Sequence, residues 1–87
     1  MNFEGISETT STFRLFGGRV GISAGASSWG SITLEVLATD ERSWLVAAPP
    51  LTANGVVFAE VLPGQYRLEL IDVVDAYIAV QPTLRAS

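Results

Sequence analysis

The chain contains no cysteine, no histidine and no lysine. The absence of cysteine excludes disulfides, and the absence of both cysteine and histidine removes the usual ligands of a zinc site. Small domains commonly gain stability from disulfides, from a bound metal or from oligomerisation. These absences leave oligomerisation as the remaining route.

Catalytic residues are also scarce. Asp72 and Asp75 are close enough to share a turn, but this turn lacks the acidic cluster of a dedicated calcium loop. The serines have no histidine nearby that would activate them as nucleophiles. The glycine-rich run 17–21 is followed by neither a lysine nor a helical pattern, so it is not a phosphate-binding loop. We therefore expect a protein that is not an enzyme and holds no metal or cofactor.

The charge balance argues against nucleic acid as a partner. Five arginines face nine acidic residues, which gives a net charge of −4. Such a surface repels phosphates. The first residues lack a basic region followed by an apolar run, and no stretch approaches the ~18 apolar residues of a membrane span. We expect synthesis in the cytoplasm, no contact with a membrane, and export only as part of a larger particle.

The chain has more apolar residues than a body of its size easily hides. Its 87 residues fit one domain, with an expected radius of gyration near ~12 Å. A domain of this size hides only roughly 60–65% of the surface of its unfolded chain. Yet 48% of the residues are hydrophobic and the mean hydropathy is +0.37. Ten alanines reduce this excess without removing it. We expect the protein to associate with itself.

Short strand-forming runs, separated by Gly, Pro, Asn and Asp, fill the chain after residue 11 and predict an all-β fold. No segment offers ten residues of helical period. The expected strands are 12–16, 19–24, 31–39, 43–47, 56–62, 65–72 and 76–81. Gly17-Gly18 should reverse the chain, so that 19–24 is the return strand of 12–16. The alternation in 65–72 should turn Tyr66, Leu68 and Leu70 inward and Gln65, Arg67 and Glu69 outward. Six to eight strands with short turns favour a small antiparallel β-sandwich over residues 12–87. The pattern leaves jelly-roll and immunoglobulin-like wiring both open.

Residues 1–11 are polar and show neither helical nor strand periodicity. We interpret this segment as an extended N-terminal arm that becomes ordered against a neighbour, with Phe3 and Ile6 as small anchors. A frayed terminus is the alternative.

The two tryptophans lie in different settings. Trp44 is inside an expected strand, and we assign it to the core. Trp29 stands between Ser28 and Gly30 in a loop, where it could contact either a sugar or a protein.

The remaining candidates for contact with other subunits are arginines and those apolar residues that lie on the polar faces of strands. Arginine pairs with carboxylates across interfaces, although a solvated strand face explains such residues as well. Leu37, Leu45 and Ile71 break the polar faces of their strands, and each could equally belong to a second buried face. The residues expected to contact other subunits are Phe3, Ile6, Trp29, Leu37, Leu45, Ile71, Arg14, Arg19 and Arg67.

Several short motifs together resemble small structural proteins of tailed bacteriophages. The strongest is the run Leu62-Pro63-Gly64-Gln65-Tyr66-Arg67-Leu68, and the others are Gly17-Gly18, Leu34-Glu35-Val36-Leu37, Asp40, Trp44 and Thr52-Ala53-Asn54-Gly55. The resemblance covers about residues 12–80. The chain departs from it by having Asp40-Glu41-Arg42 where an Asp-Gly turn is commoner, and a single proline at 63.

The resemblance implies a β-sandwich protein of the virion, with a role as a decoration, cement or head-fibre protein on the capsid surface. It implies a homo-oligomer, with a trimer favoured, whose other partner is the major capsid protein. A carbohydrate-binding module that adsorbs the particle to a host is the alternative from another class. A head-tail adaptor or tail component is a third.

Overall fold

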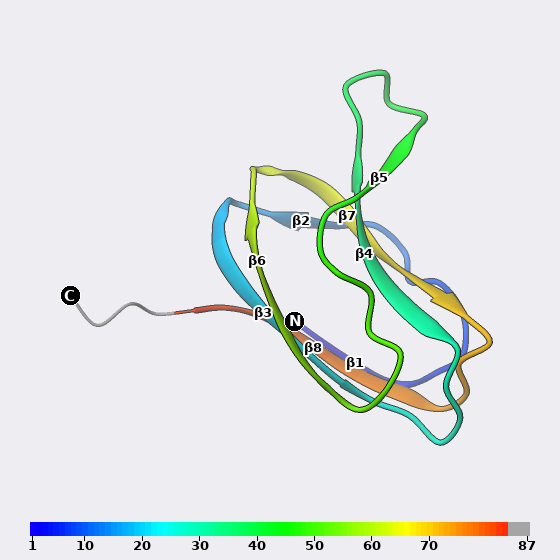
Figure 1. The fold of residues 1–87 in the computed structure, drawn as a ribbon. Helices are drawn as coiled ribbons and strands as arrows, with labels where there is room; N and C mark the ends of the chain where they lie inside the picture. The colour runs from blue at the N-terminus through cyan, green and yellow to red at the C-terminus, as the bar shows by residue number, and fades with distance from the viewer. Residues whose placement is uncertain (84–87) are drawn as a thin grey trace.

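The computed structural model describes residues 1–83, and these residues form eight β-strands and no helix (Figure 1). The strands are β1 Asn2–Ile6, β2 Phe13–Leu15, β3 Gly18–Gly25, β4 Ser31–Leu37, β5 Trp44–Val46, β6 Gly55–Val61, β7 Gly64–Ile71 and β8 Ala76–Pro82. Residues 84–87 of the predicted domain lie outside the described part. The all-β prediction is confirmed, and all seven expected strands are present. The radius of gyration is 12.4 Å, close to the value expected from length.

The strands form two four-stranded sheets, and every pairing is antiparallel. Sheet A has the order β1-β8-β3-β6, and sheet B has the order β2-β7-β4-β5. The pairs β1/β8, β2/β7, β3/β6 and β4/β5 are nested in the sequence, so residues far apart in the chain lie side by side.

One buried cluster draws side chains from both sheets. Strand β7 places Tyr66, Leu68 and Leu70 inward, as its alternation predicts, and β3 contributes Val20 and Ile22 from the opposite sheet. Leu68 has no exposed surface, and Tyr66 is only 1% exposed. The Tyr66 hydroxyl donates a hydrogen bond of 2.6 Å to the Leu62 carbonyl, so its one polar group is satisfied.

The turn residues are predicted well, but the connections that they make are not. Gly17 and Gly18 have φ of 98° and 97°, which glycine adopts at low cost, and the chain does change direction there. However, the expected return strand does not pair with β2. Strand β3 lies in the other sheet, between β6 and β8, while β2 pairs with β7. The reason is that a turn signal is local and does not encode which sheet the next strand enters.

The N-terminal segment contains a strand where the sequence predicted none. Strand β1 pairs with β8 at the edge of sheet A, and its register shifts between Phe3 and Ile6, at Gly5. Gly5 has φ of 64°, the conformation of a bulge glycine. A bulge adds one residue, so Phe3 and Ile6 both pack against the core although their spacing breaks the two-residue period. That broken period is the reason why the strand escaped prediction.

Residues after β1 follow the edge of β7. The Thr10 hydroxyl accepts a hydrogen bond of 3.0 Å from the Leu68 amide, and the Thr9 hydroxyl accepts one of 3.2 Å from the Leu70 amide. The Thr10 amide donates to the Leu68 carbonyl at 3.0 Å. The segment expected to be an arm therefore contacts both sheets of its own chain, and its contact with a neighbouring subunit stays a prediction.

Candidate interaction surfaces

The carboxylates of the described residues do not gather into a metal site. Within residues 1–83, no group of three or more Asp and Glu side chains is arranged to hold a metal ion. None of these residues forms a helix that could cross a membrane.

Asp40 carries the clearest shift in pKa, and its cause is structural. The Ser43 hydroxyl and the Ser43 and Arg42 amides donate hydrogen bonds to this carboxylate, at 2.7, 2.8 and 2.9 Å respectively. They lower the pKa of Asp40 from 3.8 to about 2, with the Ser43 side chain as the largest cause. Asp40 thus stabilises the exposed turn between β4 and β5, which is the tip of the hairpin that projects from the body in Figure 1.

The predicted contact residue Arg67 is held by its own chain. Its guanidinium Nε donates a hydrogen bond of 2.7 Å to the Glu35 carboxylate, and the guanidinium lies 4.4 Å from the centre of the Trp44 ring. A weaker ion pair joins Arg67 to Glu69 at 3.7 Å. Glu35 is buried under these contacts, at 8% exposure. The cluster lies on the outer face of sheet B and connects β4, β5 and β7.

The assignment of Trp44 needs correction, and Trp29 has a contact within its own chain. Trp44 is not in the core: it lies opposite Leu37 on the outer face of sheet B, where Arg67 covers its ring. Trp29 is partly buried and packs against the core, and its indole nitrogen donates a hydrogen bond of 2.7 Å to the Asn54 side-chain oxygen. Trp29 is therefore held at the edge of its ring and only partly exposed, and its contact with a sugar or a protein stays a prediction.

The other two arginine candidates also stack on aromatic rings of their own chain. Arg14 lies 5.8 Å from the centre of the Phe16 ring, and Arg19 lies 5.2 Å from that of Phe58. Exposed contacts of this kind are worth roughly 0.5–1 kcal/mol. They keep each guanidinium beside an exposed aromatic ring, and a role in contacting a neighbour stays a prediction for both.

The apolar candidates differ in exposure. Leu45 and Ile71 are about half exposed, at 54% and 50%, whereas Leu37 is only partly exposed. Phe3 and Ile6 are partly buried against the core. Leu45 and Ile71 are thus available to a partner in this structure, while Phe3, Ile6 and Leu37 already have neighbours in the chain.

The most exposed apolar residues within 1–83 are not among the predicted contact residues. Phe16 and Leu62 are 81% and 78% exposed. They lie in the neighbouring connections β2–β3 and β6–β7, where Gly17 approaches Pro63. We call Phe16, Leu62 and Pro63 the turn patch. The positions of Phe16 and Leu62 in the sequence indicate this exposure. Each lies next to a turn residue, Gly17 or Pro63, where a side chain has few neighbours to cover it.

A second group of exposed apolar residues covers the outer face of sheet A. Val56 and Phe58 project from β6 and Tyr77 from β8, and each is between 52% and 59% exposed. Gly21 and Gly25 lie opposite Phe58 and Tyr77 on β3. A side chain at Gly25 would overlap the Tyr77 ring, and one at Gly21 would approach the Phe58 ring to 3.2 Å. The two glycines therefore allow both rings to lie across β3.

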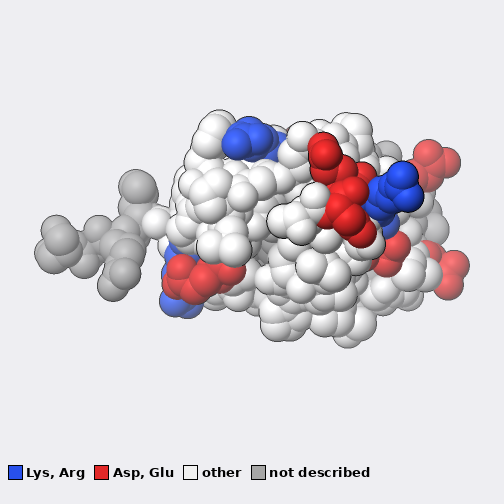
Figure 2. Space-filling view, turned by 90° about the horizontal axis from the view of Figure 1, so that it is seen from above, with Lys and Arg blue, Asp and Glu red and all other residues white. Residues whose placement is uncertain are grey.

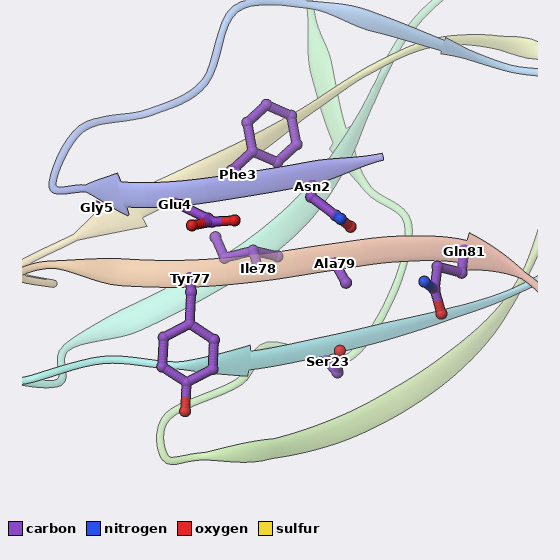
Figure 3. A pocket seen from close by; sticks show the side chains of 9 residues that line it. All are labelled: Asn2, Phe3, Glu4, Gly5, Ser23, Tyr77, Ile78, Ala79 and Gln81. Carbon is purple, nitrogen blue, oxygen red and sulfur yellow. The ribbon is translucent and has the colours of Figure 1, made fainter.

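A shallow groove of about 570 Å³ runs beside Tyr77, along β1, β8 and β3. Figure 3 shows Tyr77 projecting across β3, with Ser23, Ala79 and Gln81 along the same groove. Asn2 and Glu4 of β1 complete its polar lining.

Charged side chains are sparse on the face drawn in Figure 2. Uncharged side chains cover most of this view, and arginine and acidic side chains gather in a few groups, most of them in its right half.

Comparison of the chain with protein-family models, with curated proteins and with solved structures finds no match.

Proposed function

We propose that the protein is a non-enzymatic structural protein of a phage virion, a decoration or cement protein that binds the capsid surface as a homo-oligomer. The observation that carries this proposal is the grouping of exposed apolar side chains on two surfaces, the turn patch and the outer face of sheet A, with further ones such as Leu45, Val46 and Ile71 outside both. Monomeric soluble proteins rarely leave large apolar patches uncovered. The turn patch is the proposed contact with the shell, and sheet A carries the proposed contact between copies.

The strand order favours jelly-roll wiring of a β-sandwich. Jelly rolls have eight strands in two sheets and are common in viral capsid proteins and lectins. The nested pairs β1/β8, β2/β7, β3/β6 and β4/β5 fit one long hairpin wrapped on itself. In the immunoglobulin-like alternative the first strand pairs with the second, whereas β1 pairs with β8. Fold alone does not determine function, so this wiring supports the proposal only together with the exposed surfaces.

The protein would stabilise the shell by mass action. A ligand that binds the assembled shell and not the free subunits shifts the equilibrium towards assembly. Each contact can be weak, because an oligomer engages several capsid subunits at high effective concentration. The trimer implied by the resemblance fits this mode of binding.

Co-sedimentation with expanded shells of tailed-phage major capsid proteins tests the proposal. The wild type should sediment with the shells, and the double variant Phe16→Ser/Leu62→Ser should bind at least about tenfold more weakly. Burial of each such side chain is worth roughly 1.5–3 kcal/mol, and 1.4 kcal/mol corresponds to a factor of ten. Val74→Ser is the matched control, because it removes an exposed apolar side chain from a different connection, β7–β8. Absence of wild-type protein from the shell pellet contradicts the proposal.

One observation favours the carbohydrate-binding alternative. Tyr77 is 59% exposed beside a groove with hydroxyl, amide and carboxylate groups, the combination that an aromatic platform for a sugar requires. Tyr77 is thus a more exposed candidate for the sugar contact than Trp29. Binding of host polysaccharide that is lost in Tyr77→Ala, without co-sedimentation of the wild type with shells, would favour this function.

The head-tail adaptor alternative differs in native mass, since adaptors form larger rings.

A further inference from the structure

We propose that the outer edge of β6 pairs with β6 of a second copy of the chain, so that two copies of sheet A join into one continuous sheet. This inference specifies the self-contact of the proposed oligomer and rests on that part of the proposed function. It does not depend on the capsid as the partner.

Strand β6 differs from the three other edge strands. Strands β2 and β5 have three residues each, and β1 has five with a bulge at Gly5. Strand β6 has seven residues, Gly55–Val61, in unbroken register with β3. It contains no proline and a single charge, Glu60. Natural proteins protect exposed edges with short strands, bulges, prolines and charges. By this criterion β6 is the unprotected edge.

The hydrogen bonds of β3 show which backbone groups of β6 point outward. The Arg19 carbonyl accepts a hydrogen bond of 2.9 Å from the Thr83 amide, so the polar groups of Arg19 face β8. Because these groups alternate along an antiparallel strand, those of Val20, Ile22 and Ala24 face β6. Pro82 agrees with this alternation, since it lies opposite Val20 and has no N–H to donate.

The same alternation continues on β6. Val57 and Ala59 lie opposite Ile22 and Val20, and their backbone groups point towards β3. The backbone groups of Val56, Phe58 and Glu60 therefore point to the outer edge. Within residues 1–83, no strand pairs with that edge, and no hydrogen bond outside the strand ladders uses the backbone of these three residues.

The outer edge of β6 is complementary to a second copy of itself. Phe58 is the middle residue of β6, so a two-fold axis through it pairs all seven residues with their copies. In this register Phe58 faces its own copy and Val56 faces Glu60 of the second copy, and all three positions present their backbone groups outward. The two Glu60 carboxylates come to lie at opposite ends of the contact. The only charged residue of the strand therefore does not face the same residue of the second copy. Phe58 and its copy lie on one face of the joined sheet, where each side chain is already about half exposed.

Single-cysteine variants test the contact, since the chain has no cysteine of its own. Opposed residues of such a pair have Cα atoms about 5.5 Å apart, within the range that a disulfide spans. Under oxidising conditions and at micromolar protein, Phe58→Cys should form a covalent dimer on the order of a hundredfold faster than Val46→Cys. The reason is that pairing of the two strands raises the local concentration of thiol to the millimolar range. Val46 is the matched control: it is exposed and lies on the edge strand of sheet B. Mixing Val56→Cys with Glu60→Cys should give a cross-linked heterodimer that neither variant gives alone.

A proline variant tests the backbone contact without a thiol. Val56→Pro removes an N–H that points outward and leaves the ladder with β3 intact, so the variant should keep its β-sheet circular dichroism and lose half of its native mass. Val57→Pro removes an N–H that bonds to β3 and should instead lose the folded signal. The wild type should have the mass of two copies, or of six where the trimer contact forms too.

The outcomes separate the two proposals. A wild-type mass of one copy overturns both the β6 contact and the proposed oligomer. A mass of three copies, or equal cross-linking of Phe58→Cys and Val46→Cys, overturns the β6 contact and leaves the proposed oligomer standing.

Discussion

Gly30 is a residue whose identity the packing dictates. A Cβ atom at this position would overlap the carbonyl oxygen of Ile71, a backbone atom at the end of a central strand. The Cβ atom that Gly25 lacks would instead meet the end of the exposed Tyr77 side chain, which can rotate away. Two glycines on either side of one loop therefore differ in what they tolerate.

Gly30→Ala is expected to destabilise the fold by about 1–3 kcal/mol or more, because overpacking against backbone cannot be relieved by a rotamer change. Gly55→Ala is the matched control. Its Cβ would meet nothing closer than 3.8 Å, and surface substitutions of this kind change stability by about 0.5 kcal/mol or less. Urea unfolding of the two variants measures both values. Equal midpoints would contradict the expectation.

The Asp40 carboxylate responds to pH in a direction set by its lowered pKa. Because its folded pKa is about 2 and its ordinary value is 3.8, its contribution to the hairpin turn is complete above about 3.8 and is lost as the pH falls through about 2. Ser43→Ala removes the largest cause of the shift and should raise the pKa of Asp40 towards 3.8. Titration of the carboxyl carbon by NMR measures the change, with Thr39→Ala as the control on the same hairpin.

Three strands meet at one ionic contact on the outer face of sheet B. Arg67 of β7 pairs with Glu35 of β4 and stacks on Trp44 of β5. Strand β5 has only three residues in the ladder, so this stacking adds a side-chain contact to a short pairing.

Arg67→Ala is expected to cost about 1–3 kcal/mol, since it leaves the buried Glu35 carboxylate without its charged partner. Glu35→Gln alone should cost less, and a double-mutant cycle should give a coupling energy of about 1 kcal/mol. Arg67→Lys should restore only part of the loss, because an ammonium group cannot stack on Trp44 as a planar guanidinium does. Chemical unfolding supplies the free energies, and tryptophan fluorescence reports the environment of Trp44. A coupling energy of zero would show that the pair is not a stabilising contact.

At the scale of the whole molecule, the small core and the exposed apolar surface have one common consequence. A body of this size hides a limited share of its surface, and several of its large apolar side chains are more than half exposed. Stability should therefore depend on contact between copies.

The Tm is expected to rise with protein concentration, by a few degrees for each tenfold increase, because an oligomer that dissociates on unfolding is stabilised by mass action. Differential scanning calorimetry over a hundredfold range of concentration measures this. Val56→Pro should reduce the dependence, whereas Phe16→Ser should retain it. A Tm that stays constant over the whole range would argue for a monomer.

Prediction from sequence succeeded where the signal is local. The alternation in Gln65–Ile71 predicted both the strand and its inward residues, since side chains two residues apart must share a face. It failed at Asn2–Ile6, where a bulge breaks that period, and at Trp44, whose position within a strand does not reveal which face is covered. Among the candidate contact residues, Arg67 was predicted to face outward, but its partners Glu35 and Trp44 lie on other strands.

The amino-acid sequence by itself determined the all-β class, most strand boundaries, the turns and the absence of disulfides, because each follows from residue type or from spacing over a few positions. Only the tertiary structure decided which strands pair, which edge stays open at β6, and which apolar side chains remain exposed at Phe16, Leu62 and Phe58. The physical reason is that these properties depend on contacts between residues far apart in the chain, and local propensity carries no information about them.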